Sequence, residues 1–415
     1  SWRLKRCCMQ LLTVMPPESE FPIAANTGLQ TYVQDTYDTT LEDALADRRL
    51  YVFTRLPGFD DLPTASHVGD ETFHDVNPHV LFIRNDTDGQ LETVAIQLGS
   101  QPALYPLMYP GSVSEPTWNA ARAFARHAIS MRGVLAHVVD IHHLVHAFAP
   151  AVGRLPKNHP IAQVLRPSVD DVGLRVLVEV LLSPDIAPLP YVGIDTESVL
   201  AFLGKMEEEV VFYRDANYEK FAKLHGLWDL NDGLDMPMRP FLQGFWNLTV
   251  EYADNIVEYA YPTEQALLND MHIARWAKTL TSSTGGNIKH LTESDGVSDS
   301  CVICSKAELK NLLASYFFTT IRHSCSRFPQ LTFDLFFYPL AAWNLASSSV
   351  PSPTWTFTEQ MYMDLFRRPE GIVQGFRFLT ATAVPVQTDI SRLPSAIEND
   401  DLSLIADEFT TKLKE

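Results

Sequence analysis

The sequence predicts a mainly α-helical protein with a small antiparallel β segment near its N-terminus. Two observations support this fold class: short strand-like runs separated by turns lie before residue 100, and long stretches of helical periodicity follow from Trp118 onward. With 415 residues, of which 46% are hydrophobic, the chain can bury a sizeable core. We find no internal repeat, and the length fits one large or two ordinary domains.

The N-terminal part is expected to begin with an irregular arm over residues 1–39, because its prolines oppose regular structure. A small β-containing part over 40–110 should follow, opening with a short capped helix that starts at Thr40. The Asp88-Gly89 pair supplies a hairpin turn between the last two strands. The predicted strands are Leu50–Thr54, Val80–Ile83 and Glu92–Leu98.

The remaining part, 111–415, is expected to form a helical body. It is interrupted by a proline-rich break at 184–190 and a Ser/Thr/Gly-rich loop at 281–300. The predicted helices are 116–148, 170–182, 195–213, 240–259, 263–280, 306–327, 356–367 and 396–413.

The charge of the chain restricts its partners. Fifty-one acidic and thirty-two basic residues give a formal net charge of −19, which repels nucleic acid and anionic membranes. No apolar run approaches the length that a transmembrane helix needs. A hydrophobic small-molecule substrate fits better, and the oligomeric state is left open.

The cysteines are few and clustered: Cys7, Cys8, Cys301, Cys304 and Cys325. This pattern does not predict a disulfide framework, so we expect a reducing, cytoplasmic compartment, with secretion left open by a short basic and apolar stretch at the N-terminus. The two cysteines at 301 and 304 lack the context of a redox motif and are expected in a loop.

A histidine-rich apolar segment at 136–160 is the main candidate site. A single histidine on a buried helix is usually a hydrogen-bonded core residue, but several together favour a metal. His142 and His146 share a face of an ordinary α-helix, whereas His137 and His142 converge only across a π-turn. The spacing alone leaves both pairs open.

The predicted helix 306–327 carries His323 near its C-terminus, after a wide apolar face. This imidazole could be a third metal ligand. Alternatively, it is a residue whose positive charge the helix dipole favours.

The order of these pieces resembles the catalytic domain of a lipoxygenase, without the N-terminal β-sandwich module that many members carry. The resemblance runs from about Thr40 to at least Thr410. The segment HVLFIRNDTDGQLETVAIQL is similar to the strands before the helical body, and RGVLAHVVDIH is similar to the helix with the first metal ligands. NHPIAQVLRP, GFWNLTVEYADNIVEYAYPTEQALLNDMHIARWAKTL and IRHSCSRFPQ then follow in the family's order.

The resemblance implies a long central helix with a π-turn and a non-haem iron, or manganese, held by His137, His142 and His323. Three imidazoles around a divalent iron leave positions open for oxygen or water. Catalytic roles are therefore expected for these three histidines. Four other histidines, His127, His143, His146 and His159, are expected to be core or hydrogen-bonding residues, and His143 or His146 would replace a ligand in a different register.

Two positions depart from the family pattern. Arg327 stands where the family has a fourth ligand, and a guanidinium has no lone pair to give. It could turn outward into a salt bridge, or inward to bind a carboxylate or polarise a carbonyl. The sequence also stops at Glu415, where the family continues to a terminal isoleucine or valine that enters the site.

Four further positions align with the family's substrate channel: Gln330, Gly133, Leu174 and Val178. The resemblance implies that they orient or clamp the substrate; each could instead serve ordinary helix packing.

Three functions remain. The first is a lipoxygenase-like dioxygenase that abstracts hydrogen from a polyunsaturated chain and adds dioxygen. The second is a cyclase or isomerase that holds no metal and uses the same cavity, with Arg327 activating a carbonyl. The third, a binding protein without activity, has little support, because the sequence shows no heptad or basic stripe for a partner. Function depends on the site rather than on the fold.

Overall fold

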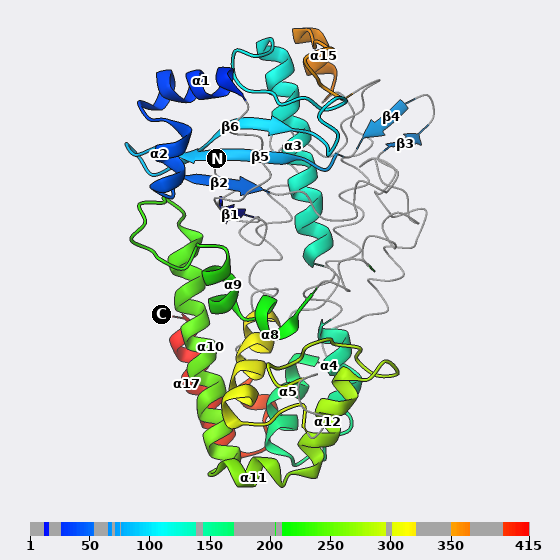
Figure 1. The fold of residues 1–415 in the computed structure, drawn as a ribbon. Helices are drawn as coiled ribbons and strands as arrows, with labels where there is room; N and C mark the ends of the chain where they lie inside the picture. Colours follow the sequence, from blue (N-terminus) through cyan, green and yellow to red (C-terminus); the bar gives the residue numbers. More distant parts are fainter. Residues whose placement is uncertain are drawn as a thin grey trace.

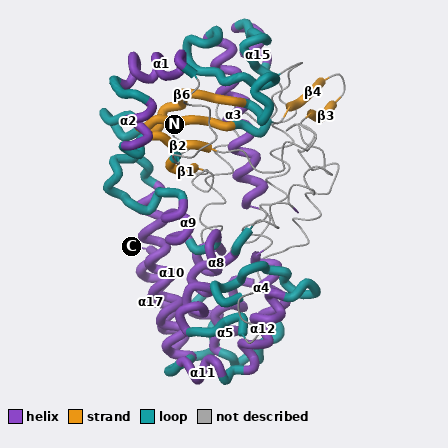
Figure 2. The backbone as a smooth tube through the Cα atoms, in the orientation of Figure 1, coloured by secondary structure: helices purple, strands orange, loops and turns teal. Residues whose placement is uncertain are grey.

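A computed structural model gives the fold of the chain (Figure 1). It confirms the mainly α-helical class and the small antiparallel sheet near the N-terminus. The strands lie at one end of the molecule with α1 (Thr27–Tyr37), α2 (Leu41–Ala46) and α15 (Glu359–Asp364), and most other helices lie at the opposite end (Figure 2). The structure describes residues 12–15, 26–53, 65–68, 71–74, 76–137, 144–169, 204, 210–295, 301–320, 350–365 and 393–414.

The main sheet has the strand order β1-β2-β5-β6, and each neighbouring pair is antiparallel. The three strands expected from the sequence correspond to β2, β5 and β6. A separate hairpin, β3 and β4, was not predicted. The strands are β1 Leu12–Val14, β2 Leu50–Phe53, β3 Ala65–Val68, β4 Glu71–His74, β5 His79–Arg84 and β6 Leu91–Gln97.

The turn between β5 and β6 confirms the hairpin predicted from Asp88-Gly89. Gly89 adopts a φ of 70°, a left-handed conformation that glycine reaches without steric cost. A Cβ atom at this position would also lie 2.4 Å from the carbonyl oxygen of Gly233. Glycine is therefore required here both by the turn and by the neighbouring loop.

Both faces of the sheet are buried. Along β2, Leu50 and Val52 pack in a cluster with residues of two short helices, whereas Tyr51 and Phe53 belong to the main core with residues of the long helix α3. Because strand side chains alternate between faces, one strand contributes to both clusters. The two short helices are α1 Thr27–Tyr37 and α2 Leu41–Ala46.

The expectation of an irregular arm over 1–39 is wrong for β1 and α1. Hydrogen bonding to β2 orders β1, and the side chain of Asn26 caps α1 by accepting the N–H of Leu29 at 3.0 Å. The prolines of the arm fall between these two elements and so break neither. At α2, Thr40 caps the helix as predicted and accepts the N–H of Asp43 at 3.0 Å.

Both outer strands of the main sheet are hydrogen-bonded to other segments. On the β1 side, the N–H of Val14 donates to the carbonyl oxygen of His225 at 3.0 Å. On the β6 side, Ile96 and Met108 exchange two backbone hydrogen bonds of 2.9 Å.

The predicted helix 116–148 is described as two pieces. α3 spans Glu115–His137 and α4 spans Leu144–Val152; the π-turn expected between them lies outside the described residues. α4 continues past its predicted end and includes Pro150. Figure 1 shows α3 running from the sheet region toward the helical end of the molecule.

The helical end is built around α10, which packs against α17, where the rings of Tyr252 and Phe409 stack at 4.3 Å. Among the described residues, no helix is long and apolar enough to cross a membrane. Predicted helix 170–182 and most of 195–213 lie outside the described residues. The other helices are α5 Pro160–Val169, α8 Phe212–Asp215, α9 Tyr218–Leu224, α10 Met238–Ala260, α11 Glu264–Leu268, α12 Met271–Thr281, 306–320, α15 Glu359–Asp364, η5 Pro394–Ala396 and α17 Asp400–Lys414.

The single helix predicted over 263–280 is wrong, because the chain forms two helices, α11 and α12. α11 ends at Leu268, and Asp270 then caps α12 by accepting the N–H groups of His272 and Ile273 at 2.8 and 3.3 Å. In a continuous helix these two N–H groups would bond to carbonyl oxygens of the preceding turn. Here the Asp270 side chain accepts them instead, so a new helix begins after Asp270.

Candidate functional site

The predicted metal ligands are reached through three helices. His137 is the last described residue of α3, α4 is described from Leu144, shortly after His142, and the helix that begins at residue 306 is described as far as Thr320, shortly before His323. The structure describes the backbone at His137, Gly133 and His146, but not their side-chain surroundings. Outside the described residues lie His142, His143, Leu174, Val178, His323, Arg327 and Gln330.

Helix 306–320 and α4 contact each other directly. The rings of Phe148 and Tyr316 stack with centroids 4.4 Å apart, and Phe148 also meets Trp276 of α12 edge-on at 5.7 Å. All three side chains are fully buried. The segments that follow His142 and precede His323 are therefore packed together in a buried, apolar environment.

His127 and His159 are both buried, as expected for core or hydrogen-bonding residues. His127, on α3, is fully buried. His159 accepts the backbone N–H of Ile161 at Nδ1 over 3.2 Å, so its proton sits on Nε2, which faces Asp270 at 2.9 Å. This contact joins the start of α5 to the start of α12.

Tyr261 completes this buried polar group by donating its hydroxyl to Asp270 at 2.8 Å. Burial raises the pKa of the Tyr261 hydroxyl, and the bond to Asp270 raises it further. Burial also raises the pKa of the Asp270 carboxyl, but hydrogen bonds from His159, Tyr261 and two backbone N–H groups outweigh it, leaving that pKa below its usual value. Asp270 is therefore a stable carboxylate that accepts hydrogen bonds from both His159 and Tyr261.

Sequence reasoning did not identify Asp270 and Tyr261 as partners of His159. Tyr261 and Asp270 follow His159 by more than a hundred positions, and no local spacing reports such a contact. Among the residues described here, no group of three or more His, Cys, Asp or Glu side chains is arranged to hold a metal.

The fold is that of a lipoxygenase catalytic domain, which confirms the resemblance. Over 100% of its length the chain superposes on a LOX variant whose anaerobic crystal structure was determined in complex with arachidonate, with a TM-score of 0.80 and 19% identity. It likewise superposes over its full length on a manganese lipoxygenase, with a TM-score of 0.77 and 13% identity.

Sequence comparison agrees with the fold. The chain is 24% identical over 288 residues, 66% of its length, to the arachidonate 12-lipoxygenase of 12R type from Rattus norvegicus. No protein-family model matches the chain. The chain matches only part of each relative: 38% of the rat protein, 62% of the LOX variant and 72% of the manganese lipoxygenase.

Proposed function

We propose that the chain is a lipoxygenase-type oxidoreductase that abstracts hydrogen from a polyunsaturated fatty acyl chain and adds dioxygen. The observation that supports this most is the whole-length superposition on lipoxygenase catalytic domains. The relatives named for arachidonate supply the substrate class.

The proposed metal is iron or manganese, and its proposed ligands are His137, His142 and His323. The donor set fits iron, since neutral imidazole is a common iron ligand; manganese is included because the chain superposes on a manganese lipoxygenase. The contact between Phe148 and Tyr316 supports the same assignment, because it holds together the two segments that lead to His142 and His323. When bound, the metal would supply the one-electron chemistry that hydrogen abstraction needs.

The chain's own residues would bind and orient the substrate. We assign Gln330 to hydrogen bonding of the substrate, Gly133 to an opening in the channel wall, and Leu174 and Val178 to apolar clamping of the acyl chain. Aromatic packing around Phe148 would exclude water from one side of the site, which protects a radical intermediate from side reactions.

The direct test measures metal content and dioxygen consumption of the purified chain with arachidonate. His142→Ala should lose both bound metal and activity, whereas the matched control His143→Ala should keep them. If His143→Ala lost bound metal and activity while His142→Ala kept them, the assigned register of the ligands would be contradicted. A wild-type protein that takes up neither iron nor manganese after anaerobic loading would contradict the function itself.

A second function has one specific observation in its favour, which is Arg327 at the position of a fourth ligand. A guanidinium in the cavity would bind a carboxylate or polarise a carbonyl, as a cyclase or isomerase without a metal requires. Turnover that persists after strong chelation and is lost in Arg327→Ala would support this alternative; turnover restored only by metal would exclude it.

A further inference from the structure

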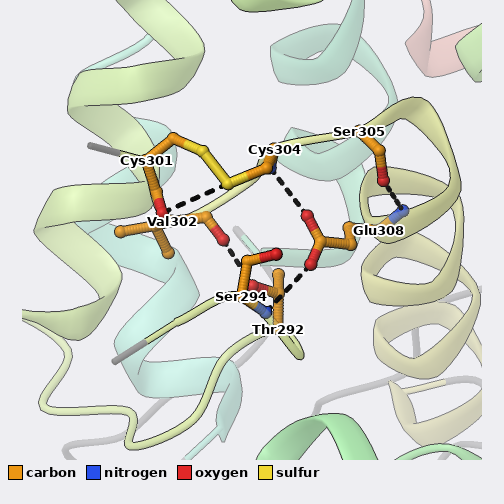
Figure 3. The surroundings of a disulfide bond; sticks show 7 residues. All are labelled: Thr292, Ser294, Cys301, Val302, Cys304, Ser305 and Glu308. Carbon is orange, nitrogen blue, oxygen red and sulfur yellow. Dashed lines mark hydrogen bonds between the residues drawn. A yellow bond between two sulfur atoms is a disulfide. The ribbon is translucent and has the colours of Figure 1, made fainter. Parts of the chain in front are cut away.

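A disulfide joins Cys301 and Cys304 in the loop before helix 306–320 (Figure 3). The structure places both cysteines in a loop, as expected from the sequence, but their pairing was not predicted. The two residues are 3 positions apart, with Cα atoms separated by 5.6 Å. The bond therefore closes a very short ring and ties no distant segments of the fold together.

Contacts that involve no sulfur hold this loop in place. The carboxylate of Glu308 accepts the backbone N–H of Cys304 at 2.7 Å and that of Ser294 at 3.0 Å. In addition, the hydroxyl of Thr292 donates to the carbonyl oxygen of Val302. Figure 3 shows the carboxylate of Glu308 bonded to both Ser294 and Cys304, and so to both segments next to the disulfide. None of these hydrogen bonds involves a sulfur atom.

The start of the helix is fixed independently as well. Ser305 caps it by accepting the N–H of Glu308 at 3.2 Å. The N–H of Lys306 donates to Glu264 of α11 at 2.8 Å, and its ammonium pairs with Glu258 of α10 at 2.6 Å. Helix 306–320 is thus anchored to two other helices, so opening the disulfide does not require the helix to move.

The two sulfur-bearing residues are also reachable and chemically unequal. Cys301 and Cys304 are partly exposed, while Ile303 between them is buried and holds the loop to the core. Cys304 directly precedes the cap of the helix, where the positive end of the dipole stabilises a thiolate. Glu308 opposes this effect, although two backbone N–H groups share its charge. Cys304 is therefore the better leaving group.

We propose that Cys301 and Cys304 form a reversible thiol–disulfide exchange site that a dithiol reductant opens while the protein stays folded. A reductant thiolate attacks Sγ of Cys301, the S–S bond breaks, and Cys304 leaves as a thiolate. The second thiol of the reductant then attacks the mixed disulfide and releases Cys301. Overall, two electrons and two protons pass to the protein, and the reductant becomes a cyclic disulfide. This inference does not depend on the proposed oxidation.

The test alkylates the intact chain after incubation with dithiothreitol under native conditions. Trypsin then releases the peptide 290–306, which contains Cys301 and Cys304 and no other cysteine. Before reduction this peptide should carry no label; after reduction it should carry two, at a rate within about tenfold of that in denaturant. Circular dichroism should be unchanged, and oxidised dithiothreitol should restore the unlabelled form.

Two variants give the controls. Val302→Ala keeps both sulfurs and should behave as wild type, whereas Cys304→Ser should leave Cys301 labelled with or without reductant. Peptide 290–306 that is labelled before reduction would show that the bond does not form. Labelling of the wild type only in denaturant, or loss of helical signal on reduction, would show a buried structural bond and overturn the proposal.

Discussion

His159 shows how a buried imidazole is held without a metal. Its ring is 8% exposed, and both nitrogens have partners: the N–H of Ile161 donates to Nδ1, and Nε2 donates to Asp270. The backbone donor fixes the tautomer, since a nitrogen that accepts a hydrogen bond cannot carry the proton. A histidine that the sequence could only assign to the core or to hydrogen bonding thus has a defined role in joining two helices.

The first prediction concerns Asp270→Asn. Asparagine can still cap α12, but its amide would meet the fixed Nε2–H of His159 donor to donor, so this bond is lost. We expect the free energy of unfolding to fall by about 2 kcal/mol, as for the loss of a charged hydrogen bond. Chemical denaturation measures it. Asp88→Asn is the control, because exposed Asp88 bonds only to a nearby backbone N–H; an equal loss in both variants would contradict the role of Asp270.

The contribution of the Asp270–His159 hydrogen bond to stability should depend on pH, because the pKa of Asp270 is lowered in the folded protein. A carboxyl whose folded pKa lies below its unfolded value of 3.8 contributes stability that is fully present above that value. This contribution is lost as the pH falls through the folded pKa. The stability difference between wild type and Asp270→Asn should therefore be constant near neutral pH and shrink below about pH 4. A difference that grows on acidification would contradict this assignment.

At the level of helices and strands, the sequence predicted those features that depend only on neighbouring residues. Thr40 marks the start of α2 and Gly89 the hairpin turn, because a cap and a left-handed turn each depend on a few neighbouring atoms. The apolar periodicity of 263–280 continues across Asp270, so it concealed the break between α11 and α12. The sequence also did not predict β1, because this strand forms by pairing with β2, which lies far along the chain.

The contact between α4 and helix 306–320 gives a prediction at this scale. Phe148→Ala removes a fully buried ring that stacks on Tyr316 and meets Trp276. We expect a loss of about 3 to 5 kcal/mol in the free energy of unfolding. Phe241→Ala is the matched control, because Phe241 is 57% exposed on α10. A small effect at Phe148, or a comparable one at Phe241, would argue against this contact as a main support of the site.

At the level of the whole molecule, the proposed metal would link the three segments of the chain that carry His137, His142 and His323. Anaerobic addition of Fe²⁺ or Mn²⁺ should therefore raise the unfolding temperature, with a gain of about 2.7 kcal/mol when free metal exceeds its dissociation constant a hundredfold. His142→Ala should abolish the shift and His143→Ala should retain it. Differential scanning fluorimetry measures the shift, and its absence in wild type would contradict the metal site independently of turnover.

The sequence predicted the fold of the whole molecule better than its site. The collinear motifs sufficed for the catalytic-domain fold, and the histidine spacing left two pairs open until the resemblance favoured His137 and His142. The structure places His137 at the end of α3 but does not test the set, because most members fall outside the described residues. The direction of the Arg327 side chain separates the two proposed chemistries, because only an inward guanidinium could bind a carboxylate or polarise a carbonyl.

The hydrogen bonds at the margins of the main sheet have a consequence for behaviour in solution. An open strand edge offers unpaired N–H and C=O groups to a second chain and so promotes aggregation. Here β1 is short and its Val14 is bonded to His225, while Ile96 of β6 is paired with Met108. These contacts occupy part of both edges of the described sheet, so they shorten the stretch of strand edge that a second chain could pair with.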